Sequence, residues 1–140
     1  MQPFFALNEL VCPHVYERDG QLAWRYLNTD LLECLLIIRR DILAVPLIVN
    51  DKSHTQRGYR CNLCSLPKEA TKKNKLYATA HFGQAVDFVP KGMTAEEARK
   101  RIAEKKDLLP CNIRLEQGTT WVHFDTYDNG TNDKITYFKG

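Results

Sequence analysis

The chain has 140 residues, of which 44% are hydrophobic and 26% are charged, and its formal net charge is +3 at pH 7. This length suits a single domain, residues 1–140, whose core needs no disulfide bonds. The composition excludes disordered, collagen-like and coiled-coil classes, and a charge this small does not identify a polyanionic partner.

The N-terminal part of the chain shows no targeting or membrane-spanning pattern. The apolar run at residues 4–7 is too short for a signal peptide. The most apolar stretch, residues 31–43, is interrupted by Arg39 and Arg40, which disfavours a transmembrane helix. We therefore expect a protein that is made in the cytoplasm and does not insert into a membrane.

The first half of the chain predicts one clear helix. Residues 2–20 predict a short helical or irregular lead-in that ends in a turn, and residues 31–43 predict a mostly buried helix. Three side chains ahead of this helix can cap it: Asn28, Thr29 and Asp30. Asp30 and Glu33 approximate a capping box. Residues 46–50 then predict a short strand.

Five cysteines are spread along the chain: Cys12, Cys34, Cys61, Cys64 and Cys111. Their odd number argues against a closed disulfide framework and favours a reducing compartment. Cys61 and Cys64 have the spacing of a zinc ribbon or a redox motif, but no second cysteine pair completes such a site. They are read either as a metal-binding or disulfide pair or as ordinary loop cysteines.

Residues 77–88 place an imidazole and a carboxylate a few residues apart. His81 and Asp87 flank Gly83, where the backbone can bend. Residues 85–89 alternate like a short strand, so Asp87 faces away from the apolar side chains beside it. A carboxylate in an apolar strand needs a partner.

The C-terminal half predicts one more helix and three strands. Thr94 and Glu97 form a capping box at the start of a helix over residues 95–105. The strands follow at residues 112–116, 120–124 and 134–138, the first two joined as a hairpin. We therefore expect an α+β domain in which helices cover one side of a small, mostly antiparallel sheet.

The strand predicted near residue 123 carries further candidate residues for the same site. Its period of two puts Trp121, His123 and Asp125 on one face. Together His81, Asp87 and His123 make the usual ligand set of a catalytic zinc, which keeps its fourth position open for water. The alternative is that these histidines are ordinary surface or hydrogen-bonded core residues.

Two motifs and a turn carry a resemblance to a known family. The chain reads Thr-Ala-His-Phe-Gly-Gln-Ala-Val-Asp at residues 79–87, Trp-Val-His-Phe-Asp at 121–125 and Arg-Gly-Tyr-Arg at 57–60. These segments resemble the zinc D-Ala-D-Ala carboxypeptidase family, peptidoglycan peptidases that share their fold with the Hedgehog signalling domain. That family reads Ser-x-His-x-x-Gly-x-Ala-x-Asp, so this chain has Thr79 for Ser and one residue fewer between His81 and Gly83.

The resemblance implies roles for residues outside the zinc ligands. Arg60 is expected to face the substrate, where a guanidinium can clamp a carboxylate or an oxyanion, and Arg57 is a weaker second candidate. Many relatives place a catalytic Asp or Glu three residues before the final His, where this chain has Thr120. Glu116 is our candidate for that general base, as in phage-type members, and the alternative is an exposed strand residue.

Two residues on the same strand face as His123 have two possible roles each. Asp125 is expected to orient the imidazole, with a role as base as the alternative. Trp121 is expected either to wall the cleft or to serve only in packing.

These expectations combine into a zinc-dependent peptidase. Its substrate would be a peptide bond involving D-alanine in peptidoglycan, cut as a carboxypeptidase or as an endopeptidase, by a monomer that phage machinery could deliver to the cell wall. Two alternatives stay open. One is a catalytically inactive zinc-binding domain of the same fold. The other, which we do not expect, is a nucleic-acid-binding module that uses the basic segment 52–75 with Tyr59 and Tyr77 as stacking groups.

Overall fold

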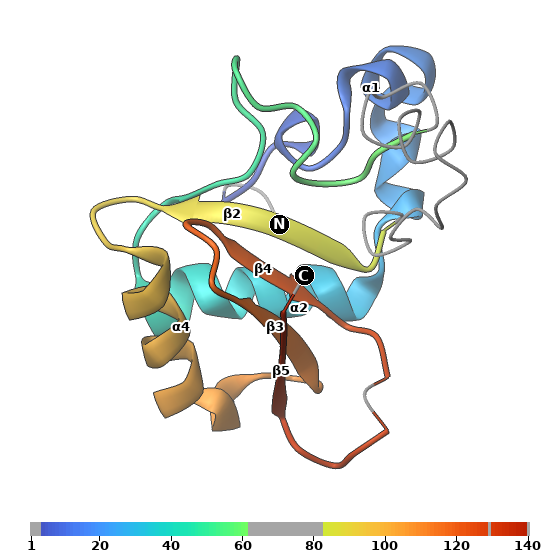
Figure 1. Cartoon of the computed structure of the whole chain (residues 1–140). Helices are drawn as coiled ribbons and strands as arrows, with labels where there is room; N and C mark the ends of the chain where they lie inside the picture. Colours follow the sequence, from blue (N-terminus) through green and yellow to red (C-terminus); the bar gives the residue numbers. More distant parts are fainter. Residues whose placement is uncertain (1–3, 62–82, 129, 140) are drawn as a thin grey trace.

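The computed structural model describes residues 4–61, 83–128 and 130–139. Within these ranges the chain forms a five-stranded sheet in the order β1-β2-β4-β3-β5 (Figure 1). The strands are β1 (Leu47–Ile48), β2 (Ala85–Pro90), β3 (Ile113–Gln117), β4 (Val122–Asp125) and β5 (Ile135–Lys139). Neighbouring strands are antiparallel except β3 and β5, which are parallel. The predicted α+β class is confirmed, and the one parallel pair makes the sheet mixed.

Helices and helical turns lie between residues 7 and 43 and again between residues 95 and 108. The α-helices are α1 (Pro13–Asp19), α2 (Thr29–Ile37) and α4 (Ala95–Glu104). Shorter helical turns are η1 (Leu7–Glu9), η2 (Gly20–Tyr26), η3 (Ile38–Leu43) and η5 (Lys106–Leu108). In Figure 1, α2 crosses behind the sheet, and α4 packs beside β2 and β4. No helix in the described part of the chain is both long and apolar enough to cross a membrane.

The core lies on one face of the sheet because the strands alternate. Val86, Phe88 and Phe124 are at most 2% exposed, and the two phenylalanine rings meet edge to face at 6.4 Å. Leu31 and Leu35 of α2 belong to the same buried cluster. Side chains at the intervening positions of β2 and β4 must therefore face the other side of the sheet, where the candidate site lies.

The caps of the two longer helices show where the local predictions hold. Thr94 accepts a hydrogen bond from the backbone N–H of Glu97, as predicted for α4. At α2 the cap is Asn28, whose side chain accepts from the N–H of Leu31. The helix already begins at Thr29, so Asp30 lies inside its first turn and the predicted capping box at Asp30 is wrong.

The end of the predicted first helix also differs. Its α-helical part stops at Ile37 and continues as the wider π-helical turn η3. Ala44 then takes a left-handed conformation, with φ of 54°, before Pro46. The hairpin of β3 and β4 and the final strand β5 lie where they were predicted, within two residues.

Candidate functional site

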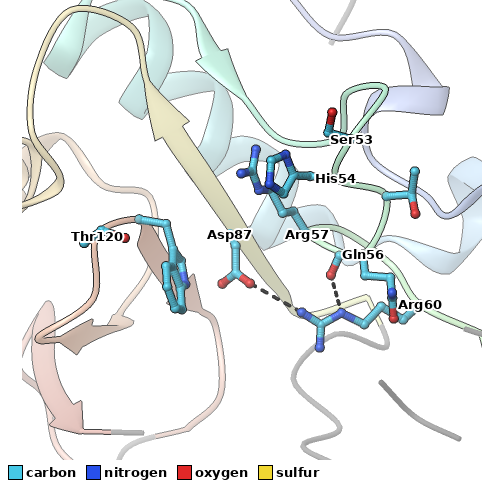
Figure 2. A pocket seen from close by; sticks show the side chains of 9 residues that line it. Ser53, His54, Gln56, Arg57, Arg60, Asp87 and Thr120 are labelled. Carbon is cyan, nitrogen blue, oxygen red and sulfur yellow. Dashed lines mark hydrogen bonds and ion pairs between the residues drawn. The ribbon is translucent and has the colours of Figure 1, made fainter. Parts of the chain in front are cut away.

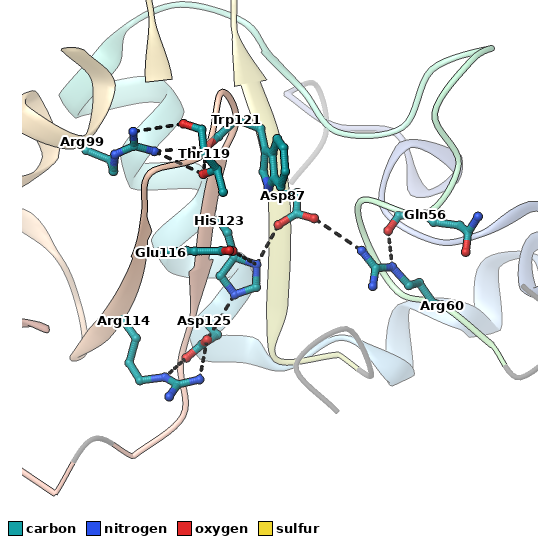
Figure 3. Close-up of polar contacts among 10 residues, drawn as sticks. All are labelled: Gln56, Arg60, Asp87, Arg99, Arg114, Glu116, Thr119, Trp121, His123 and Asp125. Carbon is teal, nitrogen blue, oxygen red and sulfur yellow. Dashed lines mark hydrogen bonds and ion pairs between the residues drawn. The ribbon is translucent and has the colours of Figure 1, made fainter. Parts of the chain in front are cut away.

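A row of four side chains crosses the sheet opposite its apolar face. Asp87 of β2 pairs with His123 of β4 in the antiparallel register. The register between β3 and β4, extended by one pair, sets Glu116 opposite His123. Phe138 of β5 lies beside Glu116. Three adjacent strands therefore bring together the imidazole and the two carboxylates (Figure 3).

One ring nitrogen of His123 faces both carboxylates. Its Nδ1 lies 2.7 Å from Oδ1 of Asp87 and 3.9 Å from Oε2 of Glu116. The His123 and Asp87 side chains are 7% and 11% exposed, and that of Glu116 is 17% exposed. The ring edge of His123 also meets Phe138, with 5.6 Å between centroids. The imidazole is thus held almost out of solvent.

The other ring nitrogen is engaged on the far side. Nε2 of His123 lies 3.2 Å from Oδ2 of Asp125, whose side chain is fully buried. Arg114 donates to both oxygens of Asp125, at 2.7 and 2.9 Å, in the paired geometry that suits a guanidinium and a carboxylate. This chain of contacts fixes the ring so that Nδ1 points toward Asp87 and Glu116.

These contacts shift the protonation of the buried groups. Burial alone lowers the pKa of His123, but its hydrogen bonds with Asp125 and Asp87 outweigh that effect and raise the pKa to about 9. Burial alone would raise the pKa of Asp125, but hydrogen bonds from His123 and Arg114 lower it. Without a metal, His123 is therefore an imidazolium that donates from both nitrogens at neutral pH, and a metal ion must displace its Nδ1 proton to bind there.

Arg60 approaches Asp87 from the loop between β1 and β2. Its Nη2 lies 3.4 Å from Oδ2 of Asp87, and its Nε donates to the backbone carbonyl of Gln56. Figure 2 shows the Asp87 carboxylate pointing toward the Arg60 guanidinium. Both residues line a cleft of about 550 Å³. The lining residues are Ser53, His54, Thr55, Gln56, Arg57, Arg60, Asp87, Thr120 and Trp121. Asp87 thus belongs both to the row of side chains on the sheet and to the lining of the cleft.

Gly83 sets the path of the chain into β2. It has a φ of 106°, which side chains disfavour. A Cβ on Gly83 would lie 2.0 Å from the carbonyl oxygen of Tyr26, so a larger residue has no room. Its own carbonyl accepts from the N–H of Asn28 at 2.8 Å. This glycine therefore fixes how β2 enters the sheet and where Asp87 falls on it.

Seven of the eight predicted site residues lie in the described ranges, and they form two adjoining groups. Asp87, His123, Glu116 and Asp125 make the row and its support, while Arg57, Arg60 and Trp121 line the cleft beside Asp87. The predicted ligand His81 lies outside the described residues. The described part of the site offers a carboxylate oxygen and an imidazole nitrogen 2.7 Å apart, which are donors that zinc accepts.

Sequence reasoning missed two features. Arg114 was not singled out, although strand alternation places it on the same face as Glu116. The second feature is a group formed by Cys12, His14 and Cys61, three residues able to hold a metal ion. The prediction that no second pair completes a metal site with Cys61 overlooked the Cys-x-His spacing at residues 12–14.

Comparisons of the chain with protein-family models, with curated proteins and with solved structures gave no significant match.

Proposed function

We propose that this protein is a zinc-dependent peptidase of the Hedgehog/D,D-peptidase type, which hydrolyses peptide bonds involving D-alanine in peptidoglycan. The observation that supports the proposal most is the row of Asp87, His123 and Glu116 beside the cleft that holds Arg60. A core packing role would not need an imidazole and two carboxylates in a row that reaches a cleft at Asp87.

The donor set fits a zinc ion. Asp87 and His123 would supply an oxygen and the Nδ1 nitrogen, and His81, outside the described residues, would supply the third ligand. When bound, zinc would polarise the scissile carbonyl and lower the pKa of its water to about 7. Asp125 holds the Nε2 side of His123, so Nδ1 stays turned toward the metal position.

Glu116 is the residue we assign as general base and then general acid. Its Oε2 lies 3.9 Å from Nδ1 of His123, so it could take a proton from a water, or give one to a leaving amine, beside that nitrogen. Among the described residues no arginine forms an ion pair with Glu116, in contrast to the pairing of Arg114 with Asp125. A carboxylate with that freedom suits proton transfer better than Asp125, which is fully buried and held by Arg114.

The cleft supplies the charge that the substrate needs. Arg60 and Arg57 line it opposite Trp121, which is 39% exposed. A peptide that ends in D-alanine carries a free carboxylate, and a guanidinium can hold it through paired hydrogen bonds. Arg60 can instead stabilise the oxyanion that forms at the scissile carbonyl. The exposed ring of Trp121 would pack against the apolar part of the peptide.

The test is release of D-alanine or peptide fragments from purified peptidoglycan, before and after chelation and zinc addition. Glu116→Gln should bind zinc like the wild type and lose at least about 100-fold in rate, because only proton transfer is removed. Glu96→Gln, an exposed carboxylate in the first turn of α4, is the matched control and should keep the wild-type rate. Full activity in Glu116→Gln would remove the base assignment.

The alternatives make different predictions in the same assay. A catalytically inactive domain of this fold would bind zinc at Asp87 and His123 but release nothing from any peptidoglycan. A nucleic-acid-binding module would need free aromatic faces, yet the Tyr59 ring is stacked on Tyr26 with centroids 5.3 Å apart. The other residues of that basic segment lie mostly outside the described ranges.

A further inference from the structure

A second set of metal-ligand side chains lies apart from the row on the sheet. One ligand atom each from Cys12, His14 and Cys61 all lie within 4.8 Å of one another. In the part of the chain that the structure describes, no other three His, Cys, Asp or Glu side chains come together this closely. None of these three residues belongs to the catalytic group proposed above.

The distances match a tetrahedral metal site. Zinc holds thiolate sulfur at about 2.3 Å and imidazole nitrogen at about 2.0–2.1 Å, so two such ligands of one ion lie roughly 3.6 Å apart. Sγ of Cys61 and Nδ1 of His14 are 3.5 Å apart. The remaining pairs of ligand atoms are at most 4.8 Å apart, so each pair must approach by about 1 Å or less to reach the distance found in a zinc site. A change of side-chain rotamer can supply this movement.

The backbone holds the two parts of this group in register. The N–H of Cys12 donates to the carbonyl of Tyr59 at 2.9 Å, and the N–H of Tyr59 donates to the carbonyl of Leu10 at 2.8 Å. Gly58 allows this approach, since a Cβ there would lie 2.1 Å from the Leu10 oxygen. Cys12 and Cys61, distant in sequence, are thus placed by a parallel bridge between residues 11 and 59.

Burial and chemistry favour a structural ion over a catalytic one. Cys12 is fully buried and Cys61 is 7% exposed, while His14 is exposed. No disulfide joins the cysteines of the described residues. Two thiols and an imidazole are the soft ligands that structural zinc sites use, and the burial of both thiols keeps them away from a substrate.

We propose that Cys12, His14 and Cys61 bind a structural Zn²⁺ ion that ties the N-terminal segment to the loop carrying Arg57 and Arg60. Cys64 follows Cys61 at zinc-ribbon spacing but lies outside the described residues, and the proposal stands on the three described ligands. Metal binding here would stabilise the wall of the cleft without taking part in hydrolysis. The proposal is independent of the peptidase assignment.

Cobalt substitution of the whole chain under reducing conditions tests this site separately. Thiolate bound to Co²⁺ gives an intense charge-transfer band in the near ultraviolet, which a site of imidazole and carboxylate ligands does not give. We expect this band in the wild type and in His123→Gln. It should be lost or at least halved in Cys12→Ser and in Cys61→Ser. Cys111→Ser is the matched cysteine control and should retain the full band.

A second measurement covers variants that fail to fold. His14 is exposed, so His14→Gln should fold and should bind zinc at least about 10-fold more weakly in competition with a chromophoric chelator. Absence of the cobalt band in the wild type would overturn the proposal. So would a band of full intensity in folded Cys12→Ser and Cys61→Ser, or an unchanged zinc affinity in His14→Gln.

Discussion

His123 is placed between two carboxylates, and that position has a cost and a use. The ring is nearly buried, yet Asp87 and Asp125 each accept from one of its nitrogens. Asp125 is in turn held by Arg114, whose guanidinium lies over the Phe138 ring at 4.6 Å. A buried ionic network of this kind is seldom the most stable way to fill a core, so stability alone does not account for it.

The stability of the metal-free protein should depend on pH through His123. Its pKa is raised from 6.5 to about 9 in the folded state, so the folded protein holds this proton more tightly than the unfolded chain does. The contribution to stability is therefore complete below about pH 6.5 and is lost as the pH rises through 9. A shift of this size corresponds to at most roughly 3–4 kcal/mol, since each pKa unit is about 1.4 kcal/mol.

Urea unfolding of chelator-treated protein at pH 6.5 and at pH 9.5 measures this effect. The wild type should lose stability between the two values, and His123→Gln should lose clearly less, because its amide does not titrate. Other groups titrate in this range in both proteins, so the difference between them isolates His123. Equal losses in the two proteins would show that the imidazole is not held as a cation.

At the scale of elements, two conditions can require a glycine: a backbone segment that comes too close for a Cβ, or a positive φ. Three glycines of this chain differ in which condition applies. Gly58 is limited by close approach to the Leu10 carbonyl, whereas Gly92 has a φ of 80° and no atom within 4 Å of an added Cβ. Gly83 has both problems, a φ of 106° and a contact of 2.0 Å with the Tyr26 carbonyl. Gly92→Ala should therefore cost only about 1 kcal/mol of strain.

Gly58→Ala and Gly83→Ala should each cost more than Gly92→Ala, with Gly83→Ala the most destabilising, because backbone must move to admit the new methyl group. Thermal unfolding of the three variants side by side gives the order. A Gly83→Ala variant as stable as Gly92→Ala would mean that the entry into β2 is less constrained than the structure shows.

The elements closest to the site were also the most predictable. β4 alternates apolar and polar residues, and in β2 Asp87 stands between two apolar residues, so the facing of Asp87 and His123 follows from local sequence. Asn28, not Asp30, caps α2, because the helix begins two residues earlier than predicted. Local sequence alone does not determine which of these residues is the cap. The parallel pairing of β5 with β3 depends on contacts between distant segments, which periodicity does not report.

For the whole molecule, the limit of prediction was long-range pairing. Cys12 and His14 reach Cys61 only because residues 11 and 59 form a bridge, and neither segment carries a periodic pattern. Arg114 was missed for a related reason: its partner Asp125 lies across a strand pair, and many strand arginines face solvent instead. The predicted metal ligands could be grouped from the sequence because two motifs contain them. The described residues include only Asp87 and His123 of that set.

Asn50 links the parts of the molecule that these sites share. Its side chain donates to the Val11 carbonyl at 2.8 Å and accepts from the N–H of Arg57 at 3.1 Å. The Arg57 carbonyl in turn accepts from the N–H of Asp87 at 2.7 Å. One buried amide thus connects the segment of Cys12, the loop of the cleft arginines and the strand that carries Asp87.

Asn50→Ala should therefore loosen all three segments together. The lost contacts leave buried backbone groups without their side-chain partner, at a cost of about 1–3 kcal/mol. Hydrogen exchange followed by mass spectrometry should show faster exchange of the amides of Cys12, Tyr59 and Asp87, each of which donates across this junction. Asn112→Ala, which removes an exposed contact of 3.4 Å with Thr131, is the control and should leave these amides unchanged. If Asn50→Ala speeds exchange at Cys12 and Tyr59 but not at Asp87, the N-terminal segment and the site strand are held independently, and a metal ion at Cys12 and Cys61 would then stabilise the loop without reaching the row on the sheet.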